Sequence, residues 1–191
     1  TFCSVSGSGD MIVAPEDPLP IQFQKEIDMM HQKWPHVQQY IVYFQNFTNT
    51  HAPVEIIKER FEQVVNLPGA VGLSVGTRPD CLPDEVVDYL AELNERMYLW
   101  VELGLQTTFE ETSKLINRAH DYQTYLDGVA KLRKHNIRVC THLINGLPGE
   151  SLEMMKENVR RTILDSDIQG IKLHLMHLMR KTRMLRDYHE G

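Results

Sequence analysis

Residues 137–164, IRVCTHLINGLPGESLEMMKENVRRTIL, decide the fold of this 191-residue chain. The first eight residues are rich in β-branched and aliphatic side chains, which is typical of a buried strand. A turn containing Gly146, Pro148 and Gly149 follows, and from Ser151 the apolar residues recur with the spacing of an amphipathic helix. The stretch therefore predicts a strand, a tight turn and a helix, the unit from which parallel sheets are built.

The same alternation extends in both directions along the chain. Strands are predicted over residues 39–47, 70–75, 97–105, 137–144 and 170–179. Helices are predicted over residues 21–34, 53–65, 83–96, 108–118, 122–135 and 151–164. We expect Thr107 or Thr108 to cap the helix over 108–118. Strands alternating with helices of about 10–15 residues predict an α/β fold with right-handed crossovers and a parallel sheet.

The composition is that of one globular domain, with 42% hydrophobic and 24% charged residues. No linker or composition shift divides residues 1–191, so we expect a single domain. No apolar run approaches the length of about 20 residues that a membrane-spanning helix needs, and no leader pattern is present. Three cysteines are too few and odd in number for a disulfide framework. We therefore expect a cytoplasmic protein without membrane contact.

The net charge of −6 gives the chain no overall attraction to nucleic acid. A basic cluster nevertheless lies near the C-terminus and consists of Arg180, Lys181, Arg183 and Arg186. Its simplest interpretation is a solvated helix end, and the alternative is a patch that binds phosphate groups.

Side chains alternate between the two faces of a strand, and one face of the predicted strands is small and polar. Glu102, Gly104 and Gln106 share this face on one strand, and His142 lies on it in another. Corresponding positions elsewhere hold Tyr43, Gln45, Gly72, Ser74, Gly76, Lys172 and His174. Buried polar groups need partners, so the pattern predicts a polar ligand near the carboxyl ends of the strands. A polar network satisfied within the protein is the alternative.

Three motifs end these strands or follow them: VELGLQT (residues 101–107), LINRAH (115–120) and HLINGLPGE (142–150). In this order they resemble the radical S-adenosylmethionine (radical SAM) superfamily. The resemblance is strongest to the branch of the elongator catalytic subunit, and within it to small bacterial proteins of the YtqA and YhcC kind. It implies a partial (β/α)6 TIM-like barrel of parallel strands, with the first strand missing or incomplete.

The resemblance also implies a chemistry. A [4Fe–4S] cluster binds S-adenosylmethionine, and one-electron reduction by a partner such as flavodoxin or ferredoxin yields a 5′-deoxyadenosyl radical that abstracts hydrogen from substrate. Kinship to the elongator subunit suggests a tRNA uridine as that substrate, with the basic cluster contacting phosphate.

Cys3 takes its meaning from the resemblance. The sequence TFCS looks like the end of the family's cysteine loop, so Cys3 is expected to be the last of three cluster ligands. The other two ligands would then precede Thr1, and the fragment as given is expected to be inactive without them. Cys81 and Cys140 are interpreted as ordinary free cysteines.

The family's cofactor contacts can be transferred to matching positions. Gln106 and His142 are expected to reach the ribose, Arg118 to bind the methionine carboxylate, and Gly146 and Leu147 to line the adenine.

At two places the sequence departs from the family pattern. Gly76 replaces a glutamate, and residues 45–50 replace the glycine-rich motif that holds the methionine amino group. Within that segment Gln45 and Asn49 are expected to substitute for the motif.

Glu102, Lys172 and His174 face the space where substrate should lie, so we expect them to contact substrate or to handle protons.

Two other functions are alternatives. A metal-dependent hydrolase on an α/β barrel is suggested by nine histidines, but His174 and His177 would point to opposite faces of a strand. A nucleic-acid-binding module using the basic cluster is disfavoured by the acidic net charge.

Overall fold

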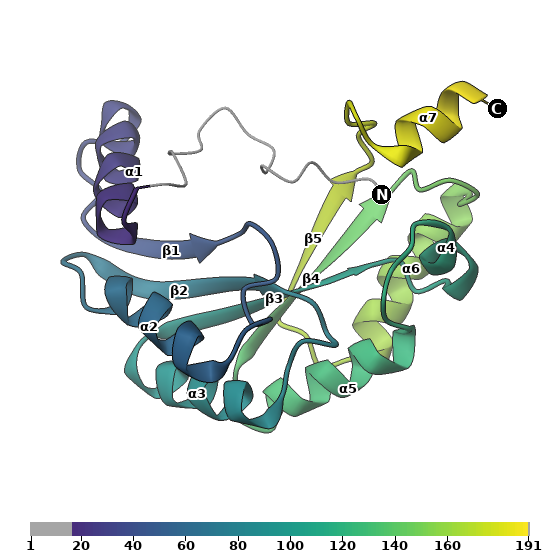
Figure 1. The fold of residues 1–191 in the computed structure, drawn as a ribbon. Helices are drawn as coiled ribbons and strands as arrows, with labels where there is room; N and C mark the ends of the chain where they lie inside the picture. The colour runs from purple at the N-terminus through teal and green to yellow at the C-terminus, as the bar shows by residue number, and fades with distance from the viewer. Residues whose placement is uncertain (1–16, 191) are drawn as a thin grey trace.

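The computed structural model describes residues 17–190 and contains one sheet of five parallel strands. The strands are β1 (Tyr40–Phe44), β2 (Ala70–Thr77), β3 (Tyr98–Gln106), β4 (Arg138–Asn145) and β5 (Gly170–Leu175), and they lie side by side in chain order (Figure 1). The twisted sheet forms a half-barrel. The predicted α/β fold of parallel strands is therefore confirmed.

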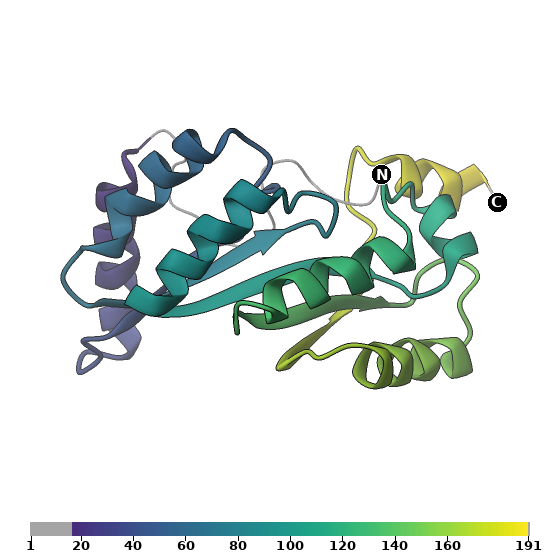
Figure 2. The same ribbon diagram turned by 90° about the horizontal axis from the view of Figure 1, so that it is seen from below.

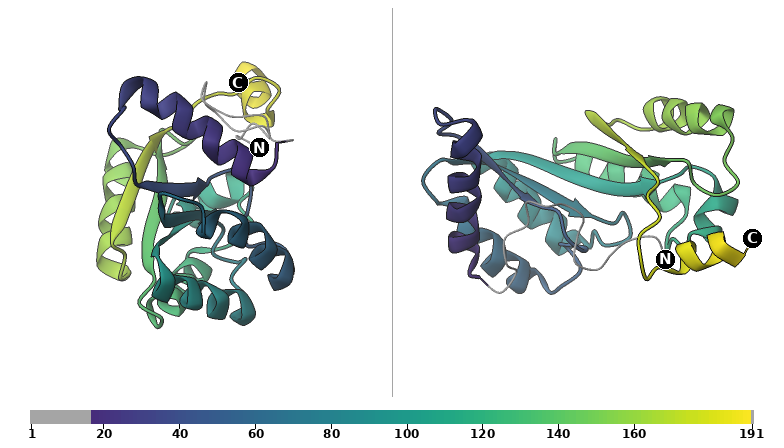
Figure 3. Two further views of the ribbon diagram at one scale, coloured as in Figure 1. Left: turned by 90° about the vertical axis from the view of Figure 1, so that its left-hand side faces the viewer. Right: turned by 90° about the horizontal axis from the view of Figure 1, so that it is seen from above.

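Most helices lie on one face of this sheet. They are α1 (Leu19–Lys33), α2 (Val54–Val65), α3 (Asp84–Arg96), α4 (Glu110–Leu115), α5 (Tyr122–Arg133), α6 (Leu152–Asp165) and α7 (Arg183–Glu190). Figure 2 shows α2, α3, α5 and α6 covering the outer face of the sheet, and Figure 3 shows α1 and α7 at its opposite ends. Within residues 17–190, no helix combines the length and the apolar character needed to cross a membrane.

The hydrophobic core lies between the sheet and these outer helices. Leu73, Val101, Leu103 and Val139 point outward from successive strands and are fully buried against the helices. Alternation then places the intervening residues on the inner face, which the outer helices leave uncovered. The predicted assignment of apolar and polar faces is confirmed on β3 and β4, where the strand period and the burial agree, but on β5 the predicted apolar residues Leu173 and Leu175 are exposed.

Some predicted boundaries differ from the structure. The strand predicted over 39–47 ends at Phe44, and the one predicted over 170–179 ends at Leu175. Helix α4 begins only at Glu110, and Phe109 is its N-terminal flanking residue. The predicted Thr107 or Thr108 cap was wrong, because neither hydroxyl bonds to an amide of α4: Thr107 donates to Glu150 and Thr108 donates to Asn158 of α6.

Tyr125 of α5 allows a test of the core. Its side chain is fully buried, and its hydroxyl lies 2.8 Å from Oγ1 of Thr141 and 3.0 Å from Oγ of Ser166. Tyr125→Phe should lower the free energy of unfolding by about 1–2 kcal/mol, because it leaves the buried Thr141 hydroxyl without its partner, whereas Ser166 still bonds to the carbonyl oxygen of Thr162. Urea denaturation measures this loss.

Tyr122→Phe, on the same helix, is the matched control. The Tyr122 hydroxyl donates to exposed Asp165 at 3.1 Å, so its removal should lower the free energy of unfolding by about 0.5 kcal/mol or less. Equal losses would contradict the expectation.

Candidate active site

Glu102, in the middle of β3, accepts hydrogen bonds from side chains of all four other strands. Tyr43 of β1 donates to Oε2 at 2.7 Å, and Ser74 of β2 donates to Oε1 at 2.6 Å. Nε2 of His142 on β4 lies 2.6 Å from Oε2. Nζ of Lys172 on β5 lies 2.8 Å from Oε1 and 2.6 Å from Oε2. We call these five residues the Glu102 cluster.

The cluster holds Glu102 as a fixed negative charge. The residue is 6% exposed, and burial by itself would raise the pKa of its carboxyl group. Hydrogen bonds from the four partners outweigh burial and hold the pKa well below its usual range. Burial and the bond to Glu102 raise the pKa of Tyr43, and burial beside Glu102 raises the pKa of the Cys140 thiol to about 11. Near neutral pH the cluster therefore contains a carboxylate and a neutral phenol.

Lys172 and His174 form the more exposed side of this arrangement on β5. Nζ of Lys172 lies 4.6 Å from the centroid of the Tyr43 ring, and its side chain is 41% exposed. The rings of His174 and His142 lie 5.0 Å apart between centroids. Lys172 and His174 thus lie at the accessible edge of the cluster, whereas Glu102 lies beneath it.

A titration of His174 can test how the charge of Lys172 acts on the neighbouring imidazole. Burial, together with the charges of His142 and Lys172, lowers the pKa of His174 below its ordinary value of 6.5. Lys172→Met should raise this pKa toward 6.5, because removing a positive charge favours the protonated ring. NMR titration of the imidazole measures the shift. Lys156→Met, which removes an exposed lysine of α6, is the control and should leave the pKa of His174 unchanged. A pKa that falls in Lys172→Met would contradict the expectation.

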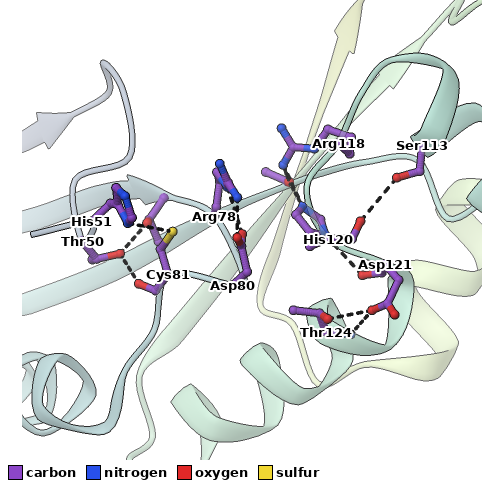
Figure 4. A network of polar contacts seen from close by, with 12 residues as sticks. Thr50, His51, Arg78, Asp80, Cys81, Ser113, Arg118, His120, Asp121 and Thr124 are labelled. Atoms are coloured by element: carbon purple, nitrogen blue, oxygen red, sulfur yellow. Dashed lines mark hydrogen bonds and ion pairs between the residues drawn. The ribbon is translucent and has the colours of Figure 1, made fainter.

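Gln106 and Arg118 meet above Gly104 at the carboxyl end of β3. A Cβ atom on Gly104 would stand 2.9 Å from Nε2 of Gln106 and 3.5 Å from Nη2 of Arg118. Arg118 donates to the carbonyl oxygen of Gly104 and, at 2.8 Å, to Nε2 of His120 (Figure 4). Burial and the Arg118 charge lower the pKa of His120, in agreement with its acceptor role. The missing side chain of Gly104 therefore allows an amide and a guanidinium to converge on the backbone of β3.

The turn after β4 lies at the carboxyl end of that strand, which is the neighbour of β3 in the sheet. Gly146 has a φ of +86°, a conformation that favours glycine, and Leu147 beside it is buried. Leu147 packs with Ile116, Ile144 and Met184 in a small apolar cluster. Met184 belongs to α7, so this helix is anchored next to the turn.

The loop after β1 has its own internal bonds. Nδ2 of Asn49 donates to the carbonyl oxygens of Phe44 (2.9 Å), Asn46 (3.1 Å) and Gly76 (2.9 Å), so its amide group holds the loop against β2. Gln45, which precedes this loop, is exposed.

The loop after β2 adds further polar contacts. Arg78 and Asp80 form an ion pair, and Cys81 lies 3.6 Å (Sγ to Nδ1) from His51 (Figure 4).

Six of the predicted site residues form two groups, and Gln45, Asn49, Gly146 and Leu147 lie in the loops after β1 and β4. Glu102, Lys172, His174 and His142 come together around one carboxylate, and Gln106 and Arg118 come together over Gly104. Gly104 and His142 are register partners on β3 and β4, so the two groups adjoin. Cys3 lies outside the described residues. Within residues 17–190 no three His, Cys, Asp or Glu side chains are grouped so as to hold a metal ion.

Sequence reasoning missed several members. Tyr43 and Ser74 were placed on the polar face but not in the site, although a phenol and a hydroxyl opposite a glutamate were available as a signal. Glu150 and Asn158, whose side chains bond to Thr107 and Thr108 directly after Gln106, were not predicted either. Only the motif position of Glu150, directly after the Gly-Leu-Pro-Gly turn, could have drawn attention to it.

Comparison with protein-family models gives a match to the model described as the radical SAM superfamily, over residues 1–162. Among curated proteins, YtqA of Bacillus subtilis is 59% identical over 191 residues, which are all of this chain and 59% of that protein. YhcC of Escherichia coli K12 is 35% identical over 192 aligned residues, again all of this chain and 60% of that protein. The chain thus spans about three fifths of the length of these relatives.

Two further similarities are more distant. The tRNA uridine(34) acetyltransferase of Methanocaldococcus infernus is 30% identical over 97 residues, 51% of this chain and 18% of that protein. The solved structure of Methanocaldococcus infernus Elp3, with an N-terminal deletion, has a TM-score of 0.75 and 21% identity. It covers 90% of this chain and 45% of that chain, which shows a shared fold.

Proposed function

The chain belongs to the radical SAM superfamily, and from this premise we propose that it binds S-adenosylmethionine at the strand ends of β3 and β4 and directs hydrogen abstraction from a tRNA uridine. The observation that carries the proposal is the pairing of Gln106 and Arg118 over Gly104. S-Adenosylmethionine on a [4Fe–4S] cluster supplies, on one-electron reduction, a 5′-deoxyadenosyl radical. This chain's own residues bind and orient the cofactor and the substrate.

The residues at the strand ends fit the cofactor chemically. A guanidinium and a primary amide side by side suit the methionine carboxylate and the ribose hydroxyls, respectively. Without a Cβ, Gly104 lets both groups pack against its backbone, side by side. The backbone of Gly146 and Leu147 offers polar groups to the adenine edge, and Gln45 and Asn49 are proposed for the methionine amino group. Cys3 is proposed as a cluster ligand on the resemblance alone.

His142 connects the cofactor site to the Glu102 cluster. A carboxylate only accepts hydrogen bonds, so Nε2 of His142 carries a proton toward Glu102 at 2.6 Å. Nδ1 is then the ring atom that we propose for a ribose hydroxyl. Glu102 thus fixes the ring orientation of His142, as carboxylates do for histidines at metal and catalytic sites.

We assign different roles to the three residues proposed for catalysis. Glu102 accepts hydrogen bonds from all its cluster partners, and its low pKa makes it a poor proton carrier. It is therefore proposed as the anchor of Lys172, whose ammonium group and the neighbouring His174 ring face the open side of the sheet. Lys172 would hold an electron-rich oxygen of the substrate, such as a uracil carbonyl, and the His174 ring, whose lowered pKa favours the neutral form, would accept a proton.

The proposal of a tRNA substrate is supported by the basic cluster. Arg180, Lys181, Arg183 and Arg186 are exposed and surround the start of α7. Met184 anchors this helix beside Leu147, next to the proposed adenine site. Phosphate groups of a nucleic acid could therefore bind at the rim of the strand ends while a base enters. The distant similarity to a tRNA uridine(34) acetyltransferase points to the same substrate class.

Two measurements test the proposed function. A version of the protein that includes the two cluster ligands proposed to precede Thr1 is reconstituted anaerobically, reduced in the presence of S-adenosylmethionine, and assayed for 5′-deoxyadenosine. Lack of cluster absorbance and of cofactor cleavage would disprove the radical chemistry. Nucleoside analysis of tRNA from cells with and without the gene then tests the substrate, and identical tRNA profiles would refute it.

A further inference from the structure

The amide side chain of Asn158, on α6, joins two segments that are far apart in the sequence. The residue is 1% exposed. Its Oδ1 accepts hydrogen bonds from the backbone N of Thr108 (2.7 Å) and from Oγ1 of Thr108 (2.8 Å). Its Nδ2 donates to Oε2 of Glu150 at 2.9 Å, and Oε1 of Glu150 accepts from Oγ1 of Thr107. Buried Asn158 and partly buried Glu150 therefore form a clamp between the end of β3 and the β4–α6 turn.

One end of the clamp holds the backbone next to Gln106. Gln106 has a φ of +75°, a left-handed conformation that is unfavourable for a residue with a side chain. The register between β3 and β4 also shifts between Gly104 and Gln106. Such a conformation persists where surrounding bonds enforce it, and the bonds to Thr107 and Thr108 begin at the very next residue. This backbone bend directs the Gln106 amide back over Gly104, beside Arg118.

The other end of the clamp holds the turn that contains Gly146 and Leu147. The backbone N of Glu150 donates to the carbonyl oxygen of Leu147 at 3.1 Å, which closes the turn. Gly146 and Gly149 both have positive φ values. Because the Glu150 carboxylate also binds Thr107 and Asn158, the turn cannot shift along β4 without breaking bonds to β3.

We propose that Asn158 and Glu150 are positioning residues, which set the distance between Gln106 and the Gly146–Leu147 turn and thereby determine the affinity for the adenosine part of S-adenosylmethionine. The inference rests on the proposed function, since it takes these two segments as cofactor contacts. The new element is that the polar clamp of Asn158 and Glu150 couples Gln106 to the Gly146–Leu147 turn.

The first test is a double-mutant cycle on the cluster-containing protein, without reductant, so that binding is measured without turnover. Asn158→Leu should weaken the Kd for S-adenosylmethionine about 10-fold or more. In a Gln106→Ala background the same substitution should cost less than about 3-fold, because the residue through which Asn158 acts is gone. Additive losses in the two backgrounds would overturn the proposal.

A matched control separates positioning from general stability. Thr162, also buried on α6, donates from Oγ1 to the carbonyl oxygen of Asn158 at 2.7 Å and has no bond to either loop. Thr162→Val should lower the melting temperature and leave the Kd unchanged. If Thr162→Val weakens binding as much as Asn158→Leu does, a structural role explains both and the proposal fails.

The second test reverses the polarity of the clamp. Asn158→Asp sets two carboxylates against each other, and Glu150→Gln sets two amide groups against each other, so each change alone should weaken binding. Together they restore an amide facing a carboxylate, and the double variant should bind within about 3-fold of the unchanged protein. A double variant weaker than either single variant would refute the proposal.

The two possible failures are distinguishable. If the unchanged protein has no measurable affinity for S-adenosylmethionine, the proposed function fails. If the unchanged protein binds and the clamp variants bind equally well, only the positioning role fails.

Discussion

Glu102→Gln is expected to lower kcat/KM for substrate about 100-fold or more and the free energy of unfolding by about 2 kcal/mol. The amide keeps the shape of the carboxylate but offers one acceptor oxygen where the cluster presents four donor residues. Lys172 loses its charged partner, and the ring of His142 loses the acceptor that orients Nε2. Both side chains would then adopt several positions, which removes the orientation that catalysis needs.

The pH dependence of stability provides an independent measurement of the same residue. The folded-state pKa of Glu102 lies below the ordinary value of 4.5, so its contribution to stability is present above about pH 4.5 and is lost as the pH falls. The difference in unfolding free energy between the unchanged protein and Glu102→Gln should therefore shrink from pH 7 toward pH 3. Urea denaturation at several pH values measures it.

Glu62→Gln is the matched control for Glu102→Gln. Glu62 also bonds an arginine and a tyrosine, Arg96 and Tyr89, but its side chain is 36% exposed. Solvent screens this pair, so the control should lose less than about 1 kcal/mol and retain full activity. Equal behaviour of the two variants would show that the Glu102 cluster has no special role.

Gly104→Ala is expected to raise the Kd for S-adenosylmethionine about 100-fold while leaving the fold almost unchanged. The added Cβ would stand 2.9 Å from Nε2 of Gln106, which is the far end of a flexible side chain. The amide can therefore move aside at little cost in stability, and the conformational restriction of alanine offsets part of that cost. However, the movement removes the amide from the place beside Arg118 where the ribose is proposed to bind.

Calorimetric titration of the cluster-containing protein measures this affinity. Gly128→Ala, on α5, introduces the same methyl group against Pro79 of the loop after β2, where it meets neither Gln106 nor Arg118, and should leave the Kd unchanged. Tight binding by Gly104→Ala would mean that neither Gln106 nor the space over Gly104 serves the cofactor.

The order of the elements could be predicted from local patterns. The strand over 137–144 and the helix after Ser151 follow from β-branched content, glycine and proline positions and helical spacing, and β4 and α6 agree with them within one residue. Strand alternation also placed Glu102, His142 and Lys172 on one face, because the period of two does not depend on the rest of the fold. Helix α4 was less predictable, since the threonines that resemble its cap find partners on α6.

The sequence by itself therefore determined the parallel α/β architecture, the polar inner face and the motifs of the strand ends, all of which depend on residues close together in the chain. Only the tertiary structure decided that Glu102 accepts hydrogen bonds from side chains of four other strands. These partners lie 28 to 70 residues away in the sequence and are brought to Glu102 by the register of the paired strands. The tertiary structure also decided the left-handed backbone of Gln106 and the Asn158–Glu150 clamp. Such contacts exist only after the strands pair and α6 packs against them, because hydrogen bonds require distances that no local spacing specifies.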